Sequence, residues 1–158
     1  MTTISIKRIL LIATLFIIAC LNNSCNETIS TEFATYQALE ESNYLQKGWI
    51  PRVLPRDAIN IKEIHNIDNN RTYGCFEFDD TTLIDTLLEL YPIASLQNVI
   101  KSIETIYLPN RPNWFITNND LKDVKPLLIK YEDVIVHIDT TRTYLIIDTI
   151  NMKGYFVH

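Results

Sequence analysis

Residues 59–78 read INIKEIHNIDNNRTYGCFEF, and this stretch decides the fold. Isoleucines alternate with polar residues from Ile59 onward, and residues 72–78 are rich in aromatic and β-branched types, as strands are. Between these runs lies Asp68-Asn69-Asn70, where asparagine tolerates the left-handed backbone of a tight turn. The stretch therefore predicts a β-hairpin with strands at 59–65 and 72–78.

The residues before the hairpin predict a helix that ends and an extended crossing that follows it. No Pro or Gly interrupts residues 31–47, and Gly48 suits the position just after a last helical turn. Pro51 and Pro55 fix their own φ angles and push the residues before them toward extended conformations. We expect a helix over 31–47, a stop at Gly48, and an extended connection into the hairpin.

After the hairpin the apolar spacing changes to that of helices. Thr82 and Asp85 are placed for a capping box, apolar residues follow at i, i+3, i+4 and i+7, and Pro92 ends this helix. The same spacing recurs at 95–103. A short helical turn is expected at 120–125.

The C-terminal residues return to the pattern of strands. Apolar and polar residues alternate at 134–138, residues 143–150 are rich in β-branched and aromatic types, and a turn at 151–154 precedes a last strand at 155–158. Helices and strands are grouped and do not alternate. The predicted class is therefore α+β, with a small antiparallel sheet of hairpins packed against an N-terminal helix and two or three further helices.

The first twenty residues, MTTISIKRILLIATLFIIAC, have the pattern of a secretory signal peptide. Two basic residues precede an apolar run from Ile9 to Ala19, which is too short to span a bilayer. Ile17-Ile18-Ala19-Cys20 resembles the bacterial lipobox, and this resemblance implies cleavage before Cys20 and lipid on its thiol. Cys25, which follows a serine, is the alternative lipidation site.

These features divide the chain into a lipoprotein signal peptide (1–19), a lipidated N-terminus with a flexible tether (20–31), and a single α+β domain (32–158). We expect an exported protein of the bacterial cell envelope, held on the membrane by its lipid. Without residues 1–19, 12 basic residues remain against 19 acidic ones, a net charge of −7. An acidic exported domain is a poor candidate for binding nucleic acid.

No catalytic or metal-binding motif stands out. His65 lies three residues before Asp68, and His137 lies on the same side of a predicted strand as Asp139, but neither pair has a third ligand at a recognisable spacing. Cys75 lies in an apolar strand and not at a helix N-terminus that would favour a thiolate. We expect no catalytic residue, no bound metal and no cofactor.

Trp49 and Trp114 both lie in proline-bearing segments, which makes them candidates for an interaction surface. The alternative is that each tryptophan packs over the edge of the core. The sequence leaves both interpretations open.

The run from Gly48 onward resembles a family of uncharacterised bacterial proteins, many of them lipoprotein-like, with the motif GW[IL]P-x-x-LP and a YbbD-type head domain. The resemblance covers roughly residues 33–80. The residues that carry it are Gly48-Trp49-Ile50-Pro51, Leu54-Pro55, Ala58, Ile61, His65, Asp68 and Phe76-x-Phe78. Asp57 stands where the family pattern favours serine, at a position suited to a turn or cap. The resemblance implies no activity.

The sequence predicts a non-catalytic, membrane-anchored binding domain with a protein or glycan partner. Two alternatives belong to other classes. One is an immunity protein whose acidic surface neutralises a basic toxin. The other is a hydrolase of envelope polymers.

Overall fold

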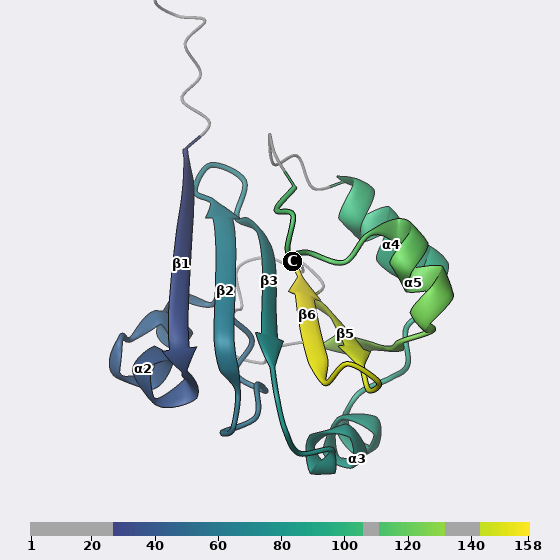
Figure 1. Ribbon diagram of the computed structural model, residues 1–158. Coiled ribbons are helices and arrows are strands. Elements are labelled where there is room, and N and C mark those ends of the chain that lie inside the picture. The colour runs from purple at the N-terminus through teal and green to yellow at the C-terminus, as the bar shows by residue number, and fades with distance from the viewer. Residues whose placement is uncertain (1–26, 106–110, 132–142) are drawn as a thin grey trace, which may run out of the picture.

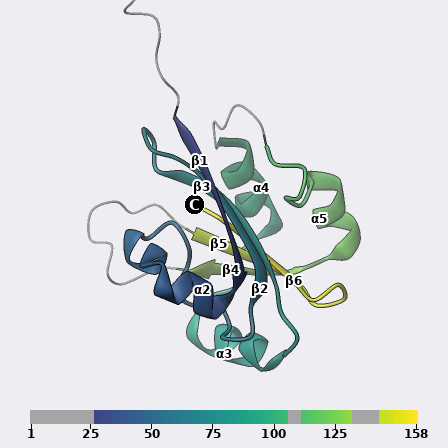
Figure 2. The same cartoon turned by 60° about the vertical axis from the view of Figure 1, so that its left-hand side comes forward.

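The computed structural model describes residues 27–105, 111–131 and 143–158. Six strands form one antiparallel sheet in the order β1-β2-β3-β6-β5-β4, and helices cover both faces (Figures 1 and 2), which confirms the α+β class. The strands are β1 (Thr28–Thr35), β2 (Ile59–Asn66), β3 (Arg71–Glu77), β4 (Leu127–Tyr131), β5 (Thr143–Asp148) and β6 (Lys153–Val157). The helices are α2 (Tyr36–Glu41), the 3₁₀ helix η1 (Tyr44–Lys47), α3 (Thr82–Leu90), α4 (Leu96–Thr105) and α5 (Asn118–Val124).

The predicted hairpin is confirmed as β2 and β3. Its turn uses Asn70 in the left-handed region, with φ at 53°. Asn66 Oδ1 accepts the N–H of Asn69 at 2.9 Å, and Asn69 Oδ1 accepts the N–H of Arg71 at 3.0 Å. Asparagine side chains therefore hold the turn that joins the two strands.

The N-terminal segment differs from the prediction. Residues 28–35 form β1, which takes up the end of the expected tether and the start of the expected helix. Ile29 and Phe33 alternate with exposed residues and pair with β2, so cross-strand packing outweighs a weak helical pattern. The helix prediction for 31–47 is wrong at 31–35 and also between α2 and η1, where Asn43 has a left-handed φ of 57°. The stop at Gly48, with φ at 81°, is confirmed.

The middle helices are confirmed as α3, α4 and α5, but the predicted cap of α3 is wrong. Thr81 is its N-cap without a side-chain bond, and Asp80 Oδ1 accepts the N–H of Thr82 at 2.9 Å instead. A capping box does form at α5, where Thr117 and Asp120 bond reciprocally. Strand β4 was not predicted, and the strand expected at 134–138 lies outside the described residues.

The sheet separates two apolar clusters, and helices lie on both of its sides (Figure 2). On one face, α2, η1, the 49–58 segment and α3 pack over side chains of β2, β3, β5 and β6; on the other face lie α4 and α5. The first cluster contains Ile61, Phe76, Leu145, Ile147 and Phe156, and the second contains Tyr73, Leu128, Tyr144, Ile146 and Val157. We call the first face the inner face.

Two glycines let aromatic rings lie flat on the sheet. Gly74 of β3 pairs with Phe156 of β6, and Phe76 pairs with Gly154. A Cβ at either glycine would overlap the ring of the opposite phenylalanine. Each ring thus covers the glycine on the neighbouring strand, which fills the centre of the inner face.

Candidate functional site

A row of polar side chains crosses the inner face at one end of its apolar cluster. His65 of β2 is directly opposite Thr72 of β3, and Thr72 exchanges both backbone hydrogen bonds with His158, at 3.3 and 3.1 Å. Thr143 of β5 shares a hydrogen bond of 2.8 Å with His158 Nδ1. Glu63 lies two residues before His65, and side chains at i and i+2 share one face. We call Glu63, His65, Thr72, Thr143 and His158 the polar row.

Glu63 and His65 form a sealed hydrogen-bonded pair. His65 Nδ1 lies 2.7 Å from Glu63 Oε1, and both residues are 0% exposed. Burial disfavours charge, so it raises the pKa of Glu63 to about 8 and lowers the pKa of His65; the charge of Lys47 lowers both. Both shifts favour the uncharged form of the group concerned.

The Trp49 side chain covers this pair by stacking on His65. Its ring stacks on the His65 imidazole with centroids 3.5 Å apart and planes at 17°, and its Nε1 donates to Asn70 Oδ1 at 2.9 Å. Tyr44 flanks the imidazole, with ring centroids 6.3 Å apart. Lys47 Nζ lies 4.5 Å from the ring centroid of Tyr44 and 5.4 Å from that of Trp49. The tryptophan of the proline-bearing segment therefore shields His65 from solvent.

Three buried atoms of the polar row have no hydrogen-bond partner: Glu63 Oε2, His65 Nε2 and Thr72 Oγ1. A histidine oriented by a carboxylate resembles a general base or a metal ligand. Here the imidazole is fully buried, however, and the described residues contain no group of three metal-ligating side chains. The arrangement can hold a proton, but it presents no group to a substrate in solution.

The two tryptophans do not share a surface. Trp49 packs on the inner face, whereas Trp114 packs on the α4 and α5 side, with its ring centroid 6.3 Å from that of Phe115. Both side chains are half-buried. Each tryptophan packs over the edge of the core, which is one of the two interpretations that the sequence left open.

The histidine–aspartate pairs do not form a site in the described residues. Asp68 is exposed in the hairpin turn, while His65 is buried and bonded to Glu63. The other predicted pair, His137 and Asp139, lies outside the described residues, as do Cys20 and Cys25. Sequence reasoning missed Glu63, although its i, i+2 spacing from both Ile61 and His65 already placed it on the apolar face.

Cys75 has the properties of a structural thiol. It is free and half-buried, and burial raises its pKa to about 11. A thiol with this pKa is almost entirely protonated at neutral pH and is a poor nucleophile.

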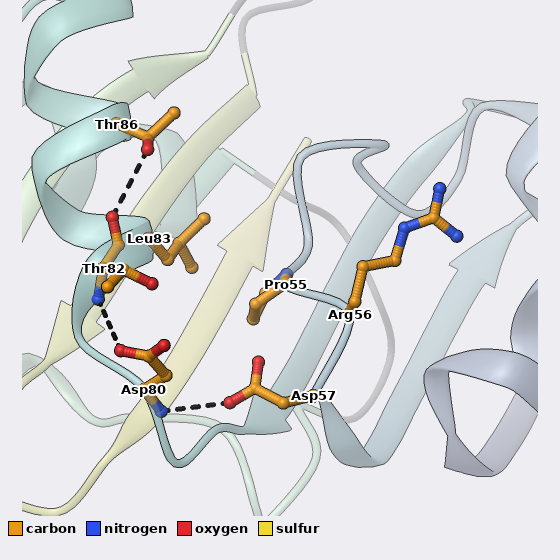
Figure 3. Close-up of a pocket in the computed structure, with 7 residues that line it drawn as sticks. All are labelled: Pro55, Arg56, Asp57, Asp80, Thr82, Leu83 and Thr86. Atoms are coloured by element: carbon orange, nitrogen blue, oxygen red, sulfur yellow. Dashed lines mark hydrogen bonds between the residues drawn. The ribbon is translucent and has the colours of Figure 1, made fainter.

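An open pocket of about 360 Å³ lies where the 49–58 segment meets the start of α3 (Figure 3). Its lining is Pro55, Arg56, Asp57, Asp80, Thr82, Leu83 and Thr86. Asp57 Oδ2 accepts the N–H groups of Asp79 and Asp80, each at 3.0 Å. Backbone hydrogen bonding to Thr82 lowers the pKa of Asp80. These carboxylates fix the start of α3, so Asp57 has a structural role at this junction.

The fold and the polar row define a small α+β domain with a sealed glutamate–histidine pair. Residues 27–77 match the family model of the YbbD head domain, which confirms the YbbD-type resemblance. The match runs from the residue before β1 to the last residue of β3 and leaves α3 to β6 outside it. Comparison with curated proteins and with solved structures found no significant match. Within the described residues, no helix has the length and apolar content needed to cross a membrane.

Proposed function

We propose that the chain is an exported, lipid-anchored, non-catalytic binding domain of the bacterial cell envelope, with a protein or glycan partner. The observation that carries the proposal is the lipobox-like sequence Ile17-Ile18-Ala19-Cys20 after a short apolar run. Two or three acyl chains on the mature N-terminus would hold the protein on the membrane durably, where a single chain would be marginal.

The position of β1 supports a domain held close to the membrane. Strand β1 begins at Thr28, eight residues after Cys20. A fully extended chain spans at most ~3.6 Å per residue, so the lipid and the sheet are separated by less than about 30 Å. A domain placed there meets partners within the envelope layer next to its own membrane.

The burial of Glu63 and His65 favours binding over catalysis. The two groups with the chemistry of an acid and a base are both 0% exposed beneath Trp49, and Asp68, the acid that the sequence places near His65, is exposed in a turn. A hydrolase needs such groups within hydrogen-bond reach of its substrate. The hydrolase alternative therefore has little support in the described residues.

The immunity alternative draws support from charge. With residues 1–19 removed, the chain carries a net charge of −7 (12 basic residues against 19 acidic), which would attract a basic toxin surface. A toxin gene adjacent to the gene of this chain in several genomes would favour this alternative. Its consistent absence would count against it.

Anchoring is tested by substitution and membrane fractionation. Cys20→Ser should move the protein from the membrane fraction to the soluble fraction, while Cys25→Ser should leave it membrane-bound. The reverse result would assign the lipid to Cys25. Retention of both variants, and of the double variant, would overturn lipid anchoring.

A further inference from the structure

The two edges of the sheet differ in how far other chain segments cover them. At the β4 edge, Ile93 forms a bridge with Ile129, Ala94 N–H donates to the Leu128 carbonyl at 2.8 Å, and Lys130 N–H donates to the Pro92 carbonyl at 3.0 Å. A chain segment thus covers that edge. Strand β1 forms the other edge (Figure 1), and within the described residues it pairs only with β2.

Strand β1 has few of the features that commonly protect an edge, and its one charged residue, Glu32, forms an ion pair with Lys62 of β2 at 3.4 Å. The strand is eight residues long, TISTEFAT, without proline or lysine. Natural edge strands are usually short, bulged, covered, or marked by lysine or proline, because unpaired N–H and C=O groups recruit other strands. A long edge of this kind suits the addition of a further strand.

The hydrogen-bond pattern identifies the backbone groups that face outward. Ile67 N–H donates to the Glu27 carbonyl, so the odd-numbered residues from 27 to 33 direct their backbone groups toward β2. The alternation changes at the end of β1, where Tyr36 N–H donates to the Ala58 carbonyl. The even-numbered residues between 27 and 33 direct theirs away from β2. These are Thr28, Ser30 and Glu32, and all three have exposed side chains.

The sequence of β1 is complementary to itself in one antiparallel register. With Thr31 opposite the partner's Thr31, Ser30 lies opposite the partner's Glu32, and Ile29 lies opposite the partner's Phe33 on the inner face. This register pairs an acceptor with a hydroxyl and two half-buried apolar side chains with each other. A shift of the register that places Glu32 opposite its own copy would oppose like charges.

We propose that β1 is the interface of a symmetric dimer, in which a second copy of this chain pairs antiparallel with β1 about Thr31 and joins two sheets into one. Ser30 and Glu32 supply the hydrogen-bonded pairs of the interface. Residue 31 faces its own copy at a non-hydrogen-bonded position, where side chains approach most closely.

The test uses the full chain in detergent and measures its mass by analytical ultracentrifugation. Ser30→Pro removes an outward N–H without touching the β1–β2 ladder, so the dimer dissociation constant should rise at least about tenfold while the unfolding temperature stays close to that of the parent. Ser30→Thr, the matched control, keeps the N–H and should remain dimeric. A monomeric parent, or a Ser30→Pro variant as dimeric as the parent, would overturn the proposal.

Cysteine cross-linking tests the register. In a chain with Cys25 and Cys75 replaced by serine, Thr31→Cys should form a disulfide with its own copy under mild oxidation, whereas Ser30→Cys should not. Efficient cross-linking through residue 30 alone would contradict the register. A parent that is monomeric but holds another protein along β1 would show that the edge binds a different partner.

Discussion

At the scale of single residues, Glu63 makes the clearest contribution to the pH dependence of stability. Its pKa is about 8 in the folded protein, against an ordinary value of 4.5. Between these values only the folded state keeps the proton, so the free energy of unfolding should fall as pH rises from about 4.5 to about 8. Glu63→Gln keeps a donor toward His65 but does not titrate, so this decline should be lost. Urea unfolding from pH 5 to pH 9 measures it, and parallel profiles for variant and parent would refute the assignment.

His65 contributes with the opposite sign. Its pKa is lowered by burial, so below the ordinary value of 6.5 the unfolded state binds the proton first and stability falls as pH decreases. Trp49→Ala removes the ring stacked on the imidazole. The pKa of His65 should then rise toward its ordinary value, with a stability loss of about 2–3 kcal/mol, below the ~3–5 kcal/mol of a fully buried tryptophan.

NMR titration of the His65 imidazole measures the first effect. Trp49→Phe is the matched control, because it keeps a stacked ring but loses the bond to Asn70. If the pKa of His65 is the same in Trp49→Ala and in the parent, the ring does not shield the imidazole.

Gly74 and Phe156 test the packing of the sheet centre. Gly74→Ala places a methyl group in the space of the buried Phe156 ring, and overpacking of this kind should cost about 1–3 kcal/mol of stability. The double variant with Phe156→Leu should recover part of this loss, because a smaller side chain makes room. Additive losses in thermal unfolding would show that the two positions are not in contact.

At the scale of elements, Asp57 joins the 49–58 segment to the start of α3. Asp57→Ala removes the acceptor of the exposed N–H groups of Asp79 and Asp80, which water then hydrates, so it should cost only about 0.5–1.5 kcal/mol. Asp57→Ser keeps one acceptor and should cost less. Equal stability of the alanine variant and the parent in urea unfolding would remove this role from Asp57.

The helices and strands also show which parts of the fold can be predicted from local sequence patterns. The β2–β3 hairpin and helices α3 and α4 follow from local alternation, turn residues and helical spacing, and these predictions are confirmed. Strand β1 was missed because its stability comes from pairing with β2, more than twenty residues away along the chain, which local propensity does not reveal. Short β4 was missed for a similar reason, since it is built on pairing with β5.

The candidate site was harder to predict than the fold. His65 was a candidate from its residue type and was considered together with Asp68, whereas the structure pairs it with Glu63. The polar row draws Thr72, Thr143 and His158 from three further segments, and only the sheet order brings them together. The sequence left open whether Trp49 packs over the core or contributes to an interaction surface. In the structure its ring stacks on the buried His65 imidazole.

At the scale of the whole molecule, the described residues form a sheet with helices on both faces (Figure 2), with a covered edge at β4 and an open edge at β1. In our proposal, the lipid lies a few residues before that open edge. Anchoring then concentrates copies in one plane, which favours pairing between neighbouring copies on the membrane.

The most direct test of the proposed function is mass spectrometry of the mature N-terminal peptide, purified from bacterial membranes. The proposal predicts a peptide that begins at Cys20 and carries the added mass of a diacylglyceryl group, with or without a further acyl chain on its amino group. A mature protein that begins at another residue, or at an unmodified Cys20, would contradict lipid anchoring at this position.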